Sequence, residues 1–176
     1  MKFIELALSN AFIIEPELIE DERGFFARSF CTQEFKNLGL NSHLAQCNIS
    51  FNHTKGTLRG MHYQEGDKSE MKIVRCTSGS ILDVIIDLRP SSPTYKKWQG
   101  IELSSANRLM LYIPEGFAHG FQTLEDNTEV FYQMGESFSP LHARGIRWDD
   151  PVFNIQWPFS KPSVISVKDQ QYPNYK

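Results

Sequence analysis

Short stretches in which β-branched and aromatic residues predominate recur along this chain, and residues that favour turns lie between them. This pattern is typical of strands rather than helices. It predicts strands at 11–14, 71–76, 80–87, 97–103, 108–113, 119–124 and 129–134. Their regular spacing favours a sandwich or barrel of antiparallel strands.

Only one segment has the pattern of a helix. Residues 32–38 begin with Thr32, a good N-cap residue, and Gly39 follows directly after them. The chain has no repeat of fixed period and no low-complexity tract, and its one Ser/Pro cluster covers only residues 89–94. We therefore expect a single domain over residues 1–176.

The composition is that of an ordinary globular protein. The chain has 176 residues, of which 40% are hydrophobic and 22% charged, so a sizeable core can be buried. The formal net charge of −3 gives no general attraction to nucleic acid. This argues against a DNA-binding domain, and recognition of a phosphate would depend on a few well-placed cations.

The cysteines and the lengths of the apolar segments indicate in which compartment of the cell the protein is located. Cys31, Cys47 and Cys76 are odd in number and widely spaced, which fits reduced thiols better than a disulfide framework or a zinc site. Neither a signal sequence nor an apolar window of ~20 residues is present. We expect a cytoplasmic protein that does not span a membrane.

The densest cluster of candidate functional residues is Gly-Thr-Leu-Arg-Gly-Met-His-Tyr-Gln at 56–64. Arg59 precedes His62 by three positions, so on one strand the two side chains point to opposite faces unless a bulge at Gly60 redirects one of them. Bulges are common beside active sites. A lone histidine is more often structural, and the cluster alone leaves both interpretations open.

A second cluster, Tyr-Ile-Pro-Glu-Gly-Phe-Ala-His-Gly-Phe-Gln at 112–122, resembles the second cupin motif, whose histidine is a metal ligand. His119 has that place here. The first cupin motif supplies two histidines as His-x-His, whereas this chain reads His-Tyr-Gln at 62–64. A two-histidine, one-carboxylate site would need a distant acid. We expect a cupin barrel that has lost its metal site.

The ordered set of motifs resembles a more specific family across nearly the whole chain, the dTDP-4-dehydrorhamnose 3,5-epimerases. The matching segments are Asp-Glu-Arg-Gly-Phe-Phe at 21–26, Gln-Cys-Asn-Ile-Ser at 46–50, the 56–64 cluster, Lys-Ile-Val-Arg-Cys at 72–76, Asp-Val-Ile-Ile-Asp-Leu-Arg at 83–89, Ser-Pro-Thr at 92–94, Ile-Pro-Glu-Gly-Phe-Ala-His-Gly-Phe at 113–121, Trp-Asp-Asp-Pro at 148–151, Trp-Pro at 157–158 and Ser-Val-Lys-Asp at 166–169.

The resemblance implies an all-β, cupin-type jelly-roll barrel that forms a homodimer and needs no cofactor. Its substrate would be a nucleotide diphosphate-linked 4-keto-6-deoxyhexose of deoxysugar and surface-polysaccharide biosynthesis. Hydrogens on C3 and C5 are acidified by the C4 ketone, so inversion requires a base on one face, stabilisation of the enolate oxygen and an acid on the other face.

Catalytic roles carry over to matching positions. The resemblance makes His62 the base, Asp169 the carboxylate that orients it, Lys72 the group near the enolate, and Tyr132 the acid. From the residues alone, Tyr132 could instead be a barrel-lining aromatic. Lys72 could be a solvated strand lysine. However, Val74 and Cys76 follow it at every second position, so all three side chains would point to the same face of a strand, and that face could be the inward one.

Two carboxylates are also open to other interpretations. Asp169 lies near the end of the chain, where most charges are exposed and mobile. Asp83, on an apolar strand, is the alternative partner carboxylate for the base or a partner of His119.

Guanidinium groups suit diphosphate oxygens, amides suit base or sugar edges, and an aromatic ring can stack on the base. The residues expected to bind substrate are Arg23, Phe26, Arg28, Gln46, Asn48, Arg59 and His119.

The sequence departs from the family pattern at two places. Arg28 stands where thymidine-nucleotide members usually have a glutamate, which would favour a CDP-linked sugar if Arg28 contacts the base; alternatively it points to solvent or pairs with a phosphate. Ser137 and Phe138 stand where tyrosines are frequent. The alternatives are a CDP-sugar epimerase that inverts one centre, a 3,4-ketoisomerase with the same barrel, and a metal-dependent cupin.

Overall fold

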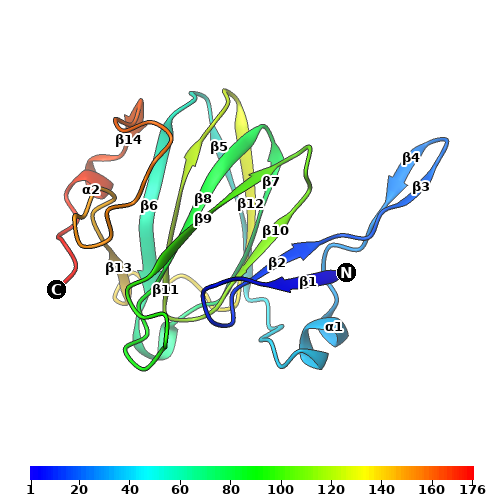
Figure 1. The fold of residues 1–176 in the computed structure, drawn as a ribbon, viewed down its shortest axis with the longest axis horizontal. Helices are drawn as coiled ribbons and strands as arrows, with labels where there is room; N and C mark the ends of the chain where they lie inside the picture. Colours follow the sequence, from blue (N-terminus) through cyan, green and yellow to red (C-terminus); the bar gives the residue numbers. More distant parts are fainter.

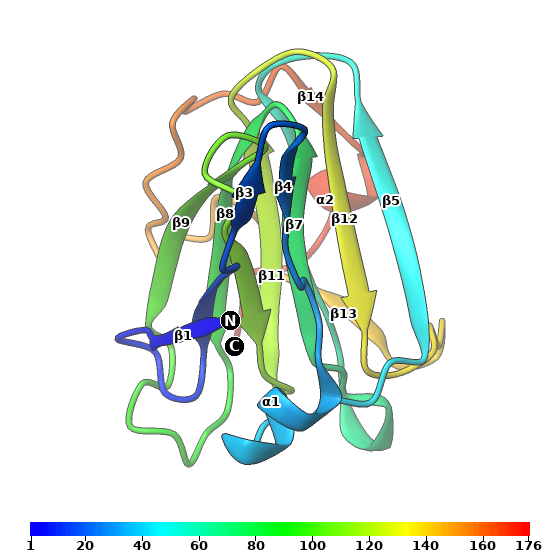
Figure 2. The same ribbon diagram turned by 90° about the vertical axis from the view of Figure 1, so that its right-hand side faces the viewer.

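The computed structural model describes residues 1–176, and strands dominate it. Two sheets face each other and enclose the core (Figures 1 and 2). The first sheet has the order β1 (Lys2–Glu5), β2 (Phe12–Glu15), β10 (Met110–Ile113), β7 (Lys72–Ser78), β12 (Thr128–Met134) and β5 (Gln46–Asn52). All its neighbouring strands are antiparallel.

The second sheet has the order β13 (Ala143–Gly145), β6 (Thr57–Gln64), β11 (Phe117–Thr123), β8 (Ser80–Asp87) and β9 (Trp98–Ser104). The short strand β14 (Val164–Ile165) pairs in parallel with β6. The remaining elements are the hairpin β3 (Ile19–Asp21) and β4 (Gly24–Phe26), the helices α1 (Thr32–Asn37) and α2 (Val167–Gln170), and the 3₁₀ turn η1 (Gly66–Lys68). The expected all-β architecture is confirmed.

Three apolar clusters hold these layers together. Between the sheets, Val74, Ile85 and Phe121 belong to one buried cluster. The outer face of the second sheet packs under the C-terminal part of the chain, in a cluster that includes Trp157. The outer face of the first sheet packs around Phe35 of α1. Helix α1 therefore covers one end of a sheet and lies outside the inter-sheet space (Figure 1).

The seven predicted strands are all present, as β2, β7, β8, β9, β10, β11 and β12. The helix is also confirmed, but its predicted cap is wrong. Thr32 is the first helical residue, and Cys31 is the N-cap without a side-chain capping bond. Gly39, just beyond the end, has a φ of +71°, which a glycine adopts at little cost.

The hairpin β3–β4 projects away from the body of the protein (Figure 1). Ile19 and Phe26 on it are 68% and 71% exposed. An isolated hairpin is only marginally stable, and exposed apolar side chains that gather on one commonly mark an interaction surface. Neither of the two short helices has the length or apolar character that crossing a membrane requires.

Candidate functional site

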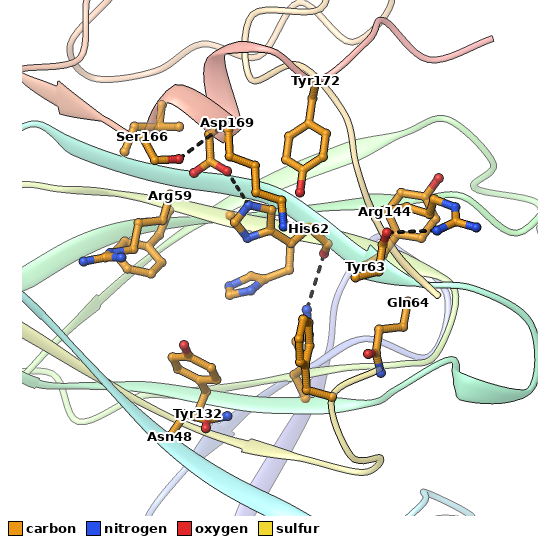
Figure 3. Close-up of a pocket in the computed structure, with 18 of the residues that line it drawn as sticks. Asn48, Arg59, His62, Tyr63, Gln64, Tyr132, Arg144, Ser166, Asp169 and Tyr172 are labelled. Carbon is orange, nitrogen blue, oxygen red and sulfur yellow. Dashed lines mark hydrogen bonds and ion pairs between the residues drawn. The ribbon is translucent and has the colours of Figure 1, made fainter. Parts of the chain in front are cut away.

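A cavity of about 830 Å³ lies between the two sheets. Side chains of β5, β7 and β12 line one wall, and side chains of β6 and β11 line the other. The segment from Val164 to Tyr172, which includes α2, contributes the remaining boundary. Figure 3 shows polar and aromatic side chains from all three parts converging on this space.

A bulge in β6 brings two polar residues to the same cavity. His62 is paired with His119, but Arg59 is paired with Phe121, so three steps along β6 match two steps along β11. Both Arg59 and His62 line the cavity, so the structure contains the bulge at Gly60 that the sequence left open. Gly60 has a φ of +134°, and a Cβ there would lie only 2.5 Å from Cα of Gly120, so glycine is required.

His62 and Asp169 form a hydrogen-bonded pair, with 2.7 Å between Nε2 and Oδ1 (Figure 3). Asp169 is only 4% exposed, and its backbone N–H donates to Oγ of Ser166, which caps α2. Burial raises the pKa of the Asp169 carboxyl, but the bonds from His62, Gly60 and Ser166 outweigh it and leave the pKa below its usual value. Asp169 is therefore an ordered carboxylate, not a mobile terminal charge.

Tyr132 projects from the facing sheet into the same cavity (Figure 3). It is paired with Asn48 on β5 and with Val74 on β7, so these three residues share the inward face. Burial raises the pKa of the Tyr132 phenol; the Arg59 charge lowers it and the Glu70 charge raises it. The phenol is therefore protonated at neutral pH and is available as a proton donor.

Lys72 also faces inward and is 6% exposed. Its ammonium lies 3.1 Å from Oε1 of Glu70 and donates to the backbone carbonyl of His62 at 3.3 Å. Val74 and Cys76, at the same parity of β7, are buried in the core between the sheets. The interpretation of Lys72 as an inward residue is therefore confirmed.

His119 lines the cavity and has a carboxylate partner of its own. Its Nε2 lies 2.6 Å from Oδ1 of Asp83, which is fully buried. Of the two interpretations of Asp83, the structure supports the partner of His119. No three His, Cys, Asp or Glu side chains converge as a set of metal ligands.

The first sheet and the bulge place three of the expected substrate-binding residues together. Arg59 donates from Nε to Oδ1 of Asn52 at 2.7 Å and from Nη2 to the backbone carbonyl of Phe51 at 3.3 Å, which fixes its guanidinium and leaves the Nη1 donors for a ligand. Gln46 donates to Oδ1 of Asn48 at 3.4 Å. Gln46, Asn48 and Arg59 all line the cavity.

The residues on and after the hairpin are placed elsewhere. Arg23 pairs with Asp21 within the hairpin, and the side chain of Phe26 is exposed. Nη1 of Arg28 lies 2.9 Å from Oε1 of Glu34 on α1. None of the three lines the cavity of its own chain, because the hairpin projects away from the sheets. Their contact with substrate stays a prediction.

Several cavity residues were not identified from the sequence. Tyr172 has its ring centroid 5.8 Å from that of His62, and a Cβ at Gly145 would collide with it. Lys168 stands beside Asp169 on α2 and also lines the cavity. Glu70 is two positions before Lys72, so in an extended chain both side chains point to the same side, and this spacing could have identified Glu70. Tyr63, Gln64, Phe138, Ala143 and Arg144 are further examples.

The arrangement suits proton transfer to and from carbon. A histidine with a carboxylate partner stands on one wall and a protonated phenol on the other (Figure 3). The Lys72 ammonium donates to the backbone carbonyl of that histidine. A base and an acid on opposite sides of a bound molecule are what an inversion at carbon requires. The ammonium can stabilise the negative charge that develops on a carbonyl oxygen.

Comparisons with known proteins agree with this chemistry. Residues 5–176 match the model of the dTDP-4-dehydrorhamnose 3,5-epimerase family. An enzyme of that name from Shigella flexneri is 44% identical over 96% of this chain and 93% of its own length.

Two solved structures extend the likeness to the fold. The Bacillus anthracis dTDP-4-dehydrorhamnose 3,5-epimerase, with TDP and pyrophosphate bound, is 40% identical with a TM-score of 0.95 over 99% of both chains. The Legionella pneumophila dTDP-6-deoxy-D-glucose-3,5-epimerase, in complex with dTDP-4-keto-L-rhamnose, is 35% identical with a TM-score of 0.91 over 98% of this chain and 92% of that one. The chain belongs to the dTDP-4-dehydrorhamnose 3,5-epimerase family.

Proposed function

We propose that this protein inverts the carbons next to the ketone of a dTDP-linked 4-keto-6-deoxyhexose by removing and returning protons. The observation that carries the proposal is the position of the His62–Asp169 pair on one wall of the cavity and Tyr132 on the other. The reaction belongs to deoxysugar biosynthesis, and the relatives and ligand-bound structures support the substrate class.

The proton is removed by His62. Its Nε2 is engaged by Asp169, so the neutral imidazole carries its hydrogen there and leaves Nδ1 as the free basic nitrogen. The C4 ketone acidifies the hydrogen on the adjacent carbon, and Nδ1 takes that proton. Asp169 then stabilises the imidazolium that forms, as a carboxylate does for a catalytic histidine.

Lys72 acts on the enolate, and Tyr132 supplies the returning proton. The Lys72 ammonium stabilises the negative oxygen at C4. Tyr132 gives its phenolic proton to the opposite face of the carbon, which inverts the centre. A positioned acid or base contributes typically about 10²–10⁴-fold, and an oxyanion donor a comparable factor.

The nucleotide diphosphate is bound at the cavity mouth. We assign the diphosphate to Arg59 and Lys168, because both are exposed cations that line the cavity. Gln46 and Asn48 offer amides to the sugar or base. The named relatives act on dTDP-sugars, so the CDP-sugar, ketoisomerase and metal-dependent alternatives are not favoured.

We also propose that the protein is a homodimer in which each hairpin reaches the other subunit. The exposed Ile19 and Phe26 support this, as does the edge strand β5, on which Ile49 and Phe51 are 65% and 43% exposed. Such a contact would cover two sets of apolar side chains that are exposed on the single chain. Light scattering on the purified protein measures the mass directly, and a monomer at assay concentration would contradict the dimer.

In the dimer, the hairpin would bring Arg23, Phe26 and Arg28 to the cavity of the partner. Phe26 would stack on the base and the two arginines would reach the phosphates, with Arg28 exchanging Glu34 for a phosphate oxygen. A cytoplasmic location is part of the proposal, and the three free cysteines support it.

The function is tested by incubating the protein with dTDP-4-keto-6-deoxyglucose and with its CDP-linked counterpart, followed by NMR of the ring-proton couplings. Inversion at C3 and C5 of the dTDP-sugar is the expected result. Transfer of the keto group from C4 to C3, or a reaction confined to the CDP-sugar, would contradict the proposal.

A further inference from the structure

Glu70 is a buried acid in the cavity that the proposed mechanism does not use. It lies between η1 and β7, two residues before Lys72, and lines the cavity with 8% of its surface exposed. Its Oε1 lies 3.1 Å from Nζ of Lys72. Its Oε2 is buried and has no hydrogen-bond partner.

The ammonium group of Lys72 has three N–H donors. One donates to the carbonyl of His62 at 3.3 Å, and a second faces Oε1 of Glu70 at 3.1 Å. The third is left for a molecule bound in the cavity that both side chains line. Two fixed acceptors thus determine where the remaining donor points, and one of them belongs to the residue that we assign as the base.

A buried ion pair is by itself weak evidence for stability, because desolvation of both charges offsets most of their attraction. The side chains of Glu70 and Lys72 are only 6% and 7% exposed, and one oxygen of Glu70 lacks a partner. An unsatisfied buried polar atom calls for another explanation than packing.

We propose that Glu70 is a positioning residue for the epimerisation: its carboxylate holds the Lys72 ammonium against the cavity wall so that the third N–H meets the oxygen on which charge develops. This inference rests on the proposed function. Glu70 acts through Lys72, so its effect depends on the presence of the ammonium group.

The test is a double-mutant cycle on solvent-exchange and inversion rates with dTDP-4-keto-6-deoxyglucose. Glu70→Ala should lower kcat by about 10- to 100-fold, since misplacement of a catalytic group is costly, with KM changed less than about threefold. Glu70→Gln keeps an oxygen acceptor and should retain most of kcat. In a Lys72→Met background, Glu70→Ala should cost less than about twofold, because the two residues act as one unit.

The matched control is Glu136→Ala. Oε2 of Glu136 lies 3.5 Å from Nζ of Lys68, and the two form an ion pair outside the cavity. Removal of the Glu136 carboxylate should leave kcat and KM unchanged. Thermal unfolding shows whether each variant folds, and if Glu70→Ala does not, Glu70→Val and Glu70→Gln complete the cycle. Equal losses with and without the ammonium group, or full kcat in Glu70→Ala, would overturn the inference. An inactive wild-type protein would instead overturn the proposed function, and the inference with it.

Discussion

Nε2 of His62 lies 2.7 Å from Oδ1 of Asp169, although 107 positions separate the two residues in the chain. His62 stands on β6 in the wall of the cavity, whereas Asp169 is on α2, which the C-terminal segment brings against β6. The orientation of the proposed base therefore depends on how this segment docks. Ser166 caps α2, and the parallel pairing of β14 with β6 docks the segment.

Replacement of Asp169 with Asn should leave the fold intact and lower kcat by about 10²–10⁴-fold, because the imidazolium loses its carboxylate partner. The pKa of Asp169 lies below its ordinary value, because the hydrogen bonds it accepts outweigh its burial, so the carboxylate stays ionised throughout the range in which enzymes are usually assayed. A loss of wild-type activity between about pH 5 and 7 would then come from another group. Rates across this range in both proteins provide the check, and an Asp169→Asn variant within tenfold of wild type would contradict the dyad.

Replacement of Tyr132 with Phe should separate exchange from inversion. If Tyr132 returns the proton on the far face, its loss leaves an enolate that only His62 can reprotonate, with retention of configuration. Deuterium from the solvent should then still enter the sugar while little inverted product accumulates. NMR measures both signals in one sample. Parallel loss of exchange and inversion would point to a binding role for Tyr132.

Replacement of Arg28 with Glu tests whether the segment that follows the hairpin contacts the phosphates of the substrate. The substitution leaves the proton-transfer groups unchanged. We expect KM to rise by up to roughly tenfold for dTDP- and CDP-linked substrates alike, because the contact is with a phosphate. The preference for dTDP should be the same in the wild type and the variant. Steady-state kinetics with both substrates decides the matter, and a wild-type CDP preference that the substitution reverses would show that Arg28 reads the base.

Asp87 supports a prediction about stability. It is fully buried and accepts hydrogen bonds from Arg89, Ser92 and Thr94. Burial raises its pKa, but these bonds outweigh that effect and lower it from 3.8 to about 2. A lowered pKa stabilises the fold above the unfolded-state value, and this stabilisation is lost as the pH falls through the folded-state value.

We therefore expect Asp87→Asn to lower the free energy of unfolding by about 2 kcal/mol at pH 7, with the difference shrinking as the pH falls from about 4 to 2. Urea unfolding of both proteins at several pH values measures this. A difference that stays constant down to pH 2 would show that the ionised carboxylate contributes no net stabilisation.

The sequence predicted the apolar strands well but missed the strands β5 and β6, which contribute much of the site, and the short strands β13 and β14 at its edge. On β5, the cavity-lining Gln46 and Asn48 replace the apolar residues that would have revealed an inward face. On β6, the bulge at Gly60 interrupts the period of two. In both strands, functional requirements disturb the pattern on which strand prediction depends.

Among the site residues, some could be identified from the sequence and others are placed only by the tertiary structure. His62 and Lys72 were identified because they stand in motifs, and the expected inward direction of Lys72 supported its assignment. Tyr132 lies outside the motifs and was identified only because its position matches the family's acid. Tyr172 had no such signal, because its contact with His62 exists only after the C-terminal segment folds back over the cavity. The projecting hairpin and the pair formed by Arg28 and Glu34 likewise depend on tertiary structure that no local pattern encodes.

If His62 moves protons on the carbons next to the ketone, incubation with dTDP-4-keto-6-deoxyglucose in D₂O should label those carbons. We predict that NMR will locate deuterium at C3 and C5 with the wild-type protein, together with inverted product. His62→Asn should keep its thermal unfolding transition and show no exchange above background. Wild-type protein that leaves both carbons protonated, or a His62→Asn variant that exchanges within tenfold of wild type, would contradict the account.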